Sequence, residues 1–462
     1  MQLDSICKNE SCKLAGIVII SFLIFFLIVT SDISAFLKGI LSIAILLTTG
    51  ILIRKITGAD GWSGFLMLKI KEGLDFIRWS NRFFGKWMDG IADFGLVFGF
   101  GLISTKLFRH VKMNTIIIGL ITLVVFSLFI SQFITVIALS VIDLPQTEIP
   151  DSSSSQFSIL SILSFAVLLI FGFAGFVALG LIAKAASVIY SIISFLLGIT
   201  PKIDSSPGVS FIIPGITIPL FEGIIALLLL LVIHEGAHGI EAIRSKVRLK
   251  SSGLLLFGFI PVGAFVDIDD NQLSKRHSKE KLRVAAAGAA SNIVATIIFF
   301  IPTILLLFSL PTFYSNHVIV IGVSKNVTDL SVGTEIYSIN GIQINSLSDF
   351  NSVKKTFMPN SNVTLETNKG IINVKTDEKG AIGILVSPTI KSEYWWIKSI
   401  YLIFALLTVL NFFVGVINLL PVQAFDGHRI IQDSIKDKKV VDLIAYIVLF
   451  ALIMNIVPWI WS

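Results

Sequence analysis

The segment 223–238, GIIALLLLLVIHEGAH, is an uncharged apolar run that ends in two histidines and a glutamate. Ionisable side chains are costly at membrane depth, so a polar cluster placed there indicates a functional site. Positions four apart stack on one face of a helix, so His234 and His238 would present their imidazoles together. Two neutral imidazoles can bind zinc, and the intervening Glu235 can serve as general base. The pattern is short, but its apolar setting favours a metal site in a membrane helix.

The composition of the chain is that of a polytopic membrane protein. Of its 462 residues, 54% are hydrophobic and 14% are charged, whereas soluble proteins carry about 25% charged residues. The formal net charge of +6 does not indicate a nucleic-acid partner, because excess Lys and Arg in membrane proteins mark cytoplasmic loops. The two cysteines, Cys7 and Cys12, fit a reduced compartment and are weak indicators of a disulfide or metal site.

Apolar runs of about 20 residues can cross a bilayer. The sequence predicts nine such spans, near residues 14–30, 36–53, 115–141, 158–180, 185–200, 222–240, 285–308, 396–420 and 440–460. Lys and Arg gather in 54–112, 241–283 and 427–439, which are therefore expected in the cytoplasm, while 142–157 has neither and is expected outside. Nine spans with a cytoplasmic amino terminus satisfy all four assignments.

The first 200 residues are expected to contribute additional spans around an amphipathic cytoplasmic segment, 54–112. Within it, residues 61–90 alternate aromatic and basic side chains, which is typical of a helix lying on an anionic leaflet. The alternative is a juxtamembrane connector with no role beyond anchoring. The glycine-rich stretch 91–105 is short for a span, and we expect it to be re-entrant or interfacial.

A catalytic zinc ion needs a third protein ligand and an open position for water. Residues 418–427, NLLPVQAFDG, follow the eighth predicted span and contain a suitable carboxylate, Asp426. Pro421 ends the helix, and Gly427 permits a tight turn toward the metal. The loop charges place both Asp426 and His238 at the cytoplasmic ends of their spans, so the sequence predicts Asp426 as the third ligand.

The motif HEGAH at 234–238, followed by N-x-x-P-x-x-x-x-D-G at 418–427, resembles the site-2 protease family of intramembrane zinc metalloproteases. Three further stretches resemble family segments: the re-entrant approach before the metal helix, the membrane-dipping hairpin after it, and the G-x-x-x-N signature of the next core span. They are PGITIP at 214–219, IPVGAFVD at 260–267 and AGAASN at 287–292. Ala289 and Phe425 stand where family members usually carry proline and leucine, which leaves the subfamily open.

The resemblance implies one zinc ion per chain, held by His234, His238 and Asp426. Glu235 would take a proton from the attacking water and deliver it to the leaving amine. Asn292 or Asn418 would donate to the developing oxyanion, or each would instead make a hydrogen bond between helices.

The substrate is expected to be a transmembrane segment of another protein. A helix hides its carbonyl groups in internal hydrogen bonds, so cleavage requires local unwinding. The extended substrate then needs a strand to pair with, and the candidate edge strand consists of Gly263, Ala264, Phe265 and Val266. The alternative is a buried hairpin that only shields the site.

Residues 317–390 change to a polar, β-branched pattern with short alternating runs at 318–322, 333–341, 363–367 and 371–375. Asn340-Gly341 is a hairpin turn signal. The pattern resembles the PDZ domains that the family carries here, and the order of spans places this domain outside the cell. Sequons at Asn326 and Asn362 are compatible with that side. Without a clear carboxylate-binding loop, we expect the domain to exclude bulky substrates or to be purely structural.

The predicted fold is a polytopic all-α membrane protein with an inserted mainly-β PDZ-like domain, in which 201–310 and 394–462 are the two halves of the protease core. The predicted function is intramembrane zinc endopeptidase, in a multi-pass protein of a prokaryotic cell membrane that needs the lipid bilayer and no nucleic acid. An ion-coupled transporter using the His/Glu/Asp cluster is the alternative, although no internal repeat of spans supports it. A prenyl-protein type of zinc protease would require a glutamate as third ligand. The sequence indicates no oligomeric state.

Overall fold

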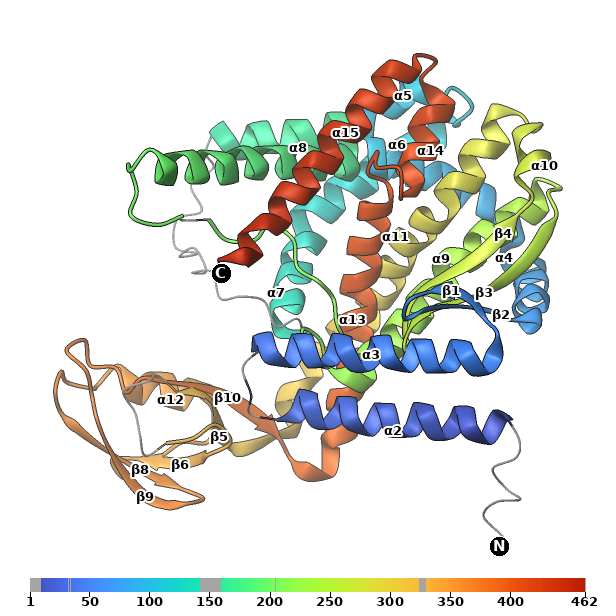
Figure 1. Ribbon diagram of the computed structural model, residues 1–462. Coiled ribbons are helices and arrows are strands. Elements are labelled where there is room, and N and C mark those ends of the chain that lie inside the picture. The colour runs from blue at the N-terminus through green and yellow to red at the C-terminus, as the bar shows by residue number, and fades with distance from the viewer. Residues whose placement is uncertain are drawn as a thin grey trace, which may run out of the picture. The chain divides into compact units, whose positions relative to one another are not determined.

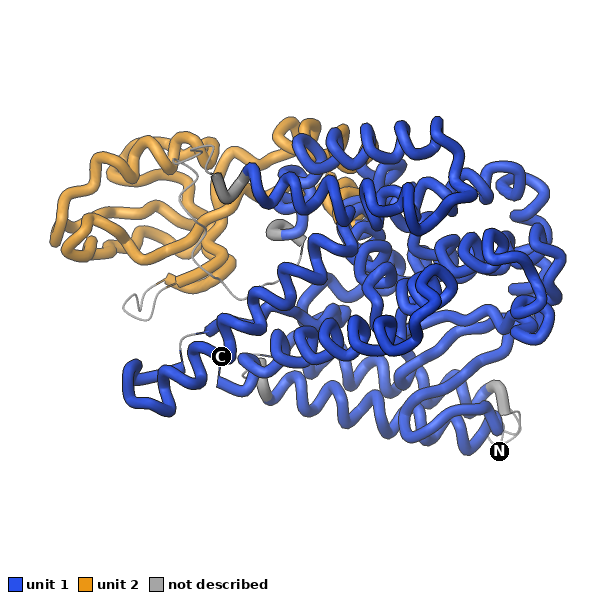
Figure 2. The backbone as a smooth tube through the Cα atoms, turned by 90° about the horizontal axis from the view of Figure 1, so that it is seen from above, with its two compact units in different colours: residues 1–300, 403–462 blue, residues 301–402 orange. Residues whose placement is uncertain are grey.

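The computed structural model describes residues 10–31, 33, 35–141, 159–203, 205–323 and 330–461 (Figure 1). Cys7, the predicted outer loop 142–157 and the sequon at Asn326 lie outside these residues. The chain divides into two compact units, one comprising residues 1–300 and 403–462 and the other residues 301–402 (Figure 2). The first is helical with one small sheet, and the second is mainly β. The predicted fold class is therefore confirmed.

Nine helical stretches of the described residues are long and apolar enough to cross a membrane. They are 12–30, 37–57, 71–107, 113–138, 162–196, 220–244, 278–313, 392–418 and 438–460. They correspond to α2 (Glu10–Thr30), α3 (Ala35–Thr57), α4 (Lys71–Phe100) with α5 (Ser104–Leu107), α6 (Met113–Val125) with α7 (Ser131–Val141), α8 (Ile159–Leu196), α9 (Leu220–Arg244), α11 (Ser278–Ser309), α13 (Trp395–Asn418) and α15 (Lys438–Ile456). The chain is a multi-pass membrane protein.

Two of the predicted spans, 158–180 and 185–200, are a single helix, α8. The helix continues through Lys184, whose side chain is half-buried with its Nζ 3.5 Å from Ser206 Oγ. The helix bends instead at Gly172, whose φ of 66° favours glycine. A Cβ at this position would lie 2.3 Å from the carbonyl oxygen of Gly99, so only glycine fits the bend.

The segment predicted as one interfacial helix, 61–90, is divided between strands and a longer helix. Its first part forms the hairpin of β1 (Asp60–Trp62) and β2 (Phe65–Lys69), and α4 then continues through most of the stretch expected to be re-entrant. The alternation at 65–69 fits a strand period of two, with Leu66 fully buried, and pairing with distant strands decided the conformation. One candidate span is thus gained and one lost before residue 220, so the predicted number of spans ahead of α9 is unchanged among the described residues.

The small sheet has the strand order β1-β2-β3-β4 and joins residues 60–69 to residues 249–268. Strands β3 (Leu249–Phe257) and β4 (Ile260–Ile268) form the expected hairpin after the metal helix, with Gly258 at φ 63° in its turn. Strand β2 pairs with β3, while β4 is the last strand of the order. The amino-terminal region therefore completes a sheet that lies directly beside the candidate site, which the sequence did not indicate.

Helix α9 follows Pro219 and carries Glu222 in its first turn and Arg244 in its last, charges that suit the helix dipole. After β4 come the short α10 (Asp270–Ser274) and then α11. After α13 the chain turns at Pro421, and α14 (Asp426–Ser434) begins with its carboxylate in the first turn. Helices α9, α11 and α14 supply the polar groups of the candidate site.

The second unit is an antiparallel sheet of order β10-β5-β6-β8-β9, with β7 paired to β6. Its elements are β5 (Tyr314–Val323), β6 (Glu335–Ile339), β7 (Ile342–Gln343), α12 (Leu347–Lys354), β8 (Asn362–Thr367), β9 (Gly370–Lys375) and β10 (Ile384–Ile390). The predicted hairpin turn is present, with φ of 50° at Asn340 and 80° at Gly341. The core of the unit includes Val318, Ile336 and Phe350. Its likeness to PDZ domains stays a prediction.

Candidate metal centre

Three side chains from two distant helices meet at one point. His234 and His238 project from α9 and Asp426 from the start of α14. The Nε2 atoms of the two histidines are 3.3 Å apart, and Asp426 Oδ2 lies 3.3 Å from that of His234 and 3.2 Å from that of His238. Both imidazoles are buried, and Asp426 is half-buried. The structure thus brings together the two histidines of the motif and the carboxylate predicted 188 positions further along the chain.

One face of α11 forms the wall behind the two imidazoles. His238 Nδ1 donates a hydrogen bond to the carbonyl oxygen of Val284 at 2.7 Å. The His234 Nδ1 atom lies 3.1 Å from the Asn292 amide group. The amide nitrogen is placed nearest to the ring, while Asn292 Oδ1 is buried without a partner. Rotating the amide by 180° lets Oδ1 accept a hydrogen bond from Nδ1–H. This orientation satisfies both groups and is the one that the hydrogen-bond network favours.

With both Nδ1 atoms acting as donors, both Nε2 atoms carry free lone pairs toward Asp426. Three acceptors at about 3 Å repel each other unless positive charge lies among them, either a proton on an imidazole or a metal ion. Burial raises the pKa of the Asp426 carboxyl, but the adjacent imidazoles lower it by more, so the pKa is below its usual range. The donor set of two imidazoles and one carboxylate fits zinc.

Gly288 leaves room for an ion at this point. A Cβ built on Gly288 would lie 2.3 Å from His238 Nε2 and 2.7 Å from His234 Nε2. A methyl group would therefore occupy the space where the two ring nitrogens converge. Val284 and Gly288 were not predicted as parts of the site, although their four-residue spacing with Asn292 places all three on one helix face.

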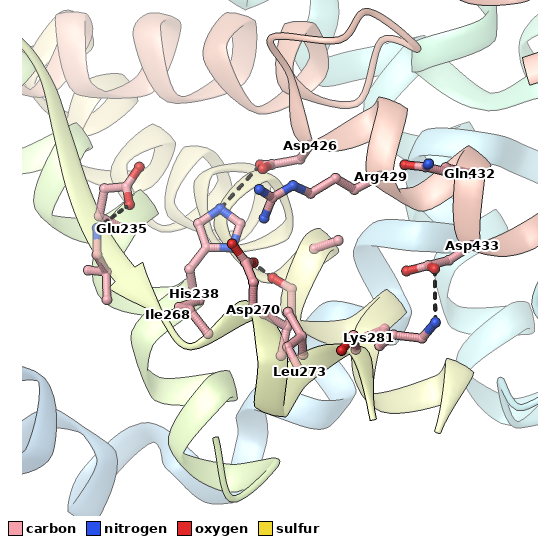
Figure 3. A pocket seen from close by; sticks show the side chains of 14 residues that line it. Glu235, His238, Ile268, Asp270, Leu273, Lys281, Asp426, Arg429, Gln432 and Asp433 are labelled. Carbon is pink, nitrogen blue, oxygen red and sulfur yellow. Dashed lines mark hydrogen bonds and ion pairs between the residues drawn. The ribbon is translucent and has the colours of Figure 1, made fainter. Parts of the chain in front are cut away.

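A cavity of about 490 Å³ opens beside this cluster, lined by Glu235, His238 and Asp426 together with residues of β4, α10, α11 and α14 (Figure 3). Figure 3 shows the Glu235 carboxylate next to strand β4 and His238 pointing toward Asp426. Further out, the ammonium group of Lys281 pairs with Asp433 at 3.1 Å. Glu235, His238 and Asp426 therefore face the same cavity.

The four candidate edge-strand residues lie in β4. The Val266 amide donates to Glu235 Oε2 at 3.1 Å, so it points away from β3. In an antiparallel strand, backbone groups of alternate residues point to the same edge, so those of Ala264 face this edge as well. Gly263 and Phe265 are directed toward β3 by the same alternation. An extended peptide could add to this edge next to Glu235.

The remaining predicted site residue, Asn418, does not join the cluster. Its Nδ2 donates to the carbonyl oxygen of Val414 in its own helix at 3.0 Å. No hydrogen bond described in this part of the chain links it to the histidines or to Asp426. Its side chain is half-buried at the end of α13.

Comparison with known proteins identifies a matching family model and several related proteins. The family model described as "Peptidase family M50" matches residues 222–457, which is 236 of the 462 residues. This range contains all of the histidine, asparagine and carboxylate side chains just described. An uncharacterized protein of Methanocaldococcus jannaschii is 33% identical over 288 residues, which cover 61% of this chain and 73% of the relative.

Proposed function

The chain belongs to peptidase family M50, and from this premise we propose that it is an intramembrane zinc endopeptidase acting on membrane-anchored proteins. The observation that carries the proposal is the convergence of His234 Nε2, His238 Nε2 and Asp426 Oδ2 at the wall of a cavity that also exposes Glu235. These three side chains would hold one zinc ion. A zinc ion bound there would acidify a water molecule and polarise the scissile carbonyl group.

The side chains of the site have separate tasks in this mechanism. Glu235 takes a proton from the attacking water and passes it to the leaving amine. Its carboxylate is held in place by the Val266 amide. The Val284 carbonyl and Asn292 orient the two imidazoles so that each Nε2 faces the ion. Because Asn292 contacts the Nδ1 side of His234, orienting the ring is favoured as its role over the predicted stabilisation of an oxyanion. Asn418 would first have to leave the Val414 carbonyl to donate to an oxyanion.

We propose that the substrate is a transmembrane segment that unwinds locally and adds to the outer edge of β4. The backbone groups of Ala264 and the carbonyl of Val266 at this edge offer the hydrogen bonds that the unwound segment has lost. Because Val266 also contacts Glu235, a peptide on this edge passes the general base. The catalytic residues would lie near the cytoplasmic face of a prokaryotic cell membrane, and the second unit, as a PDZ-like domain, would lie outside and exclude bulky substrates.

A cleavage assay with metal analysis tests the proposal. The full chain is purified in lipid with zinc and mixed with a reporter that has a single transmembrane segment. Wild type is expected to bind one zinc ion and cleave, whereas Glu235→Gln should bind zinc and not cleave. Glu222→Gln, a change in the same helix far from the cluster, is the matched control and should behave as wild type. Cleavage by Glu235→Gln would exclude Glu235 as the general base. Wild type that binds no zinc would exclude the proposed metal centre.

The same assay addresses the alternative of an ion-coupled transporter. A transporter needs no general base and would not cut the reporter in any variant. Ion uptake into vesicles that is lost in Glu235→Gln, without cleavage by wild type, would favour transport.

A further inference from the structure

A buried group of charges joins α4, which precedes the family match, to the helices of the metal site. Arg283 in α11 donates from Nε to Asp93 Oδ1 at 2.8 Å and from Nη2 to Asp93 Oδ2 at 2.6 Å. Its third nitrogen, Nη1, donates to Asp89, also in α4. Arg283 is 8% exposed and Asp93 is 3% exposed. A bidentate pair of this kind sets direction as well as distance.

The group extends to the metal helix itself. Arg244, at the end of α9, donates to Asp89 at 2.6 Å. Glu241 is 2% exposed, and its Oε2 is 3.9 Å from the Arg244 Nε. His110, in the loop after α5, lies 3.2 Å from Asp93. Asp89 therefore contacts an arginine from α9 and an arginine from α11, whereas Asp93 contacts the arginine of α11.

Stability alone does not account for such a group. Taking charges out of water is costly, and replacing a buried ion pair by apolar residues of similar volume is often neutral or stabilising. What a buried bidentate pair provides is one defined arrangement of its helices. The arrangement it defines here is the position of α11 against α4 and α9.

The position of α11 matters for the metal because Arg283 directly precedes Val284. The Val284 carbonyl accepts from His238 Nδ1, and Gly288 and Asn292 follow on the same face. A slip of α11 by one residue would move all three by about 1.5 Å along the axis. Functional sites tolerate displacements of only about 0.5 Å.

We infer that Asp93 is a positioning residue of the metal site, which it serves through Arg283 by holding α11 in register with α9. The inference rests on the metal centre of the proposed function. Asp93 lies 129 positions before the first matched residue of the family. The amino-terminal helix α4 is consequently part of the catalytic unit.

Metal affinity of the full chain tests this without relying on cleavage. Zinc affinity is measured by competition with a chelator, and the absorption spectrum of the cobalt-substituted protein reports ligand geometry. Asp93→Asn is expected to weaken zinc binding by about tenfold, the lower end of the effect of losing a partner bonded directly to a metal ligand, and to change the cobalt spectrum.

The matched control is Asn455→Ala. Asn455 is 1% exposed and joins α15 to α8 through the Leu181 carbonyl, away from the candidate metal. This variant should lower the melting temperature and leave zinc affinity and the cobalt spectrum unchanged. The double variant Asp93→Asn/Arg283→Gln should bind zinc no more weakly than whichever single variant has the lower zinc affinity. Both changes break the same Asp93–Arg283 interaction, so their effects should not add.

Zinc affinity of Asp93→Asn within twofold of wild type, with an unchanged cobalt spectrum, would overturn the inference while leaving the metal centre intact. Should Asp93→Asn not fold, Asp93→Glu keeps the charge and displaces the carboxylate. It is then expected to show weaker zinc binding and an altered spectrum, and wild-type values in both would equally overturn the inference. Wild type that binds no zinc would overturn it together with the proposed function.

Discussion

The Val266 amide and the Glu235 carboxylate are joined by a hydrogen bond of 3.1 Å between strand β4 and helix α9. The bond fixes the carboxylate at the outer edge of the sheet, where β4 pairs with no further strand of the described residues. In the proposed mechanism, a peptide that pairs with this edge would meet the general base at a set position. The contact would then connect substrate alignment with proton transfer.

Val266→Pro tests this contact. Proline removes the amide hydrogen, and the ladder with β3 is spared because this amide points away from it. A hydrogen bond to a charged group contributes about 1.5–3 kcal/mol, so cleavage should fall by about 10- to 100-fold with zinc retained. Val266→Ala keeps the amide and should lose little. Equal cleavage by both variants would show that the amide has no part in catalysis.

Asp426→Asn tests the third ligand. The amide has no negative charge to offer the ion, and even changes outside the ligand set cost about 10- to 100-fold in metal affinity. Zinc affinity measured against a chelator should therefore fall by more than that range. Asp433→Asn, two turns further along α14 and paired with Lys281, is the control and should bind zinc normally. An unchanged affinity in Asp426→Asn would exclude this carboxylate as a ligand.

Gly288→Ala tests the space between the imidazoles. Alanine stabilises a helix relative to glycine by about 1 kcal/mol, so the chain should fold. Its methyl group would contact both Nε2 atoms, and zinc content should drop below one ion in ten chains, an order-of-magnitude expectation for a blocked site. Gly236→Ala is the matched control, because a Cβ there meets nothing within 4 Å. Full zinc occupancy in Gly288→Ala would show that the ion does not lie between the two Nε2 atoms.

The cluster could be foreseen because its chemistry is local. The spacing of His234 and His238 needs only a helix, and the charge pattern of the loops brought Asp426 to the same depth. The β3–β4 hairpin and the Asn340-Gly341 turn follow in the same way from short-range signals. Each of these expectations depends on residues close in sequence or on the order of the spans.

Other features depend on contacts that no local pattern encodes. Arg283 and Asp93 are 190 positions apart, and their pairing decides how α4 lies against α11. Strand β2 forms because β3 is available to it, although its aromatic and basic residues also suit an interfacial helix. The bend of α8 at Gly172 requires the close approach of Gly99. Each of these features is set by tertiary packing.

The orientation of the Asn292 amide gives the last prediction. If Oδ1 accepts the His234 Nδ1 hydrogen, then Asn292→Asp keeps an acceptor and should retain zinc affinity. Asn292→Ala has no acceptor and should lose about 10- to 100-fold. Thr296→Ala removes a buried hydroxyl that donates to the Asn292 backbone carbonyl at 3.0 Å and leaves the amide side chain in place, so this control should leave zinc affinity unchanged. If the amide nitrogen instead donates to Nδ1, the ring proton is on Nε2 and opposes zinc binding, so Asn292→Ala would bind zinc no more weakly than wild type.

The same pair of variants separates ring orientation from oxyanion stabilisation. An aspartate at position 292 cannot donate to an oxyanion, and loss of one such donor costs about 100- to 1,000-fold in turnover. Because Asn292 lies behind His234 and not at the cavity, Asn292→Asp should cleave the reporter at a rate within about tenfold of wild type, well short of that loss. If Asn292→Asp instead binds a full complement of zinc and its cleavage rate falls by about 100- to 1,000-fold, Asn292 would be assigned as a donor to the oxyanion.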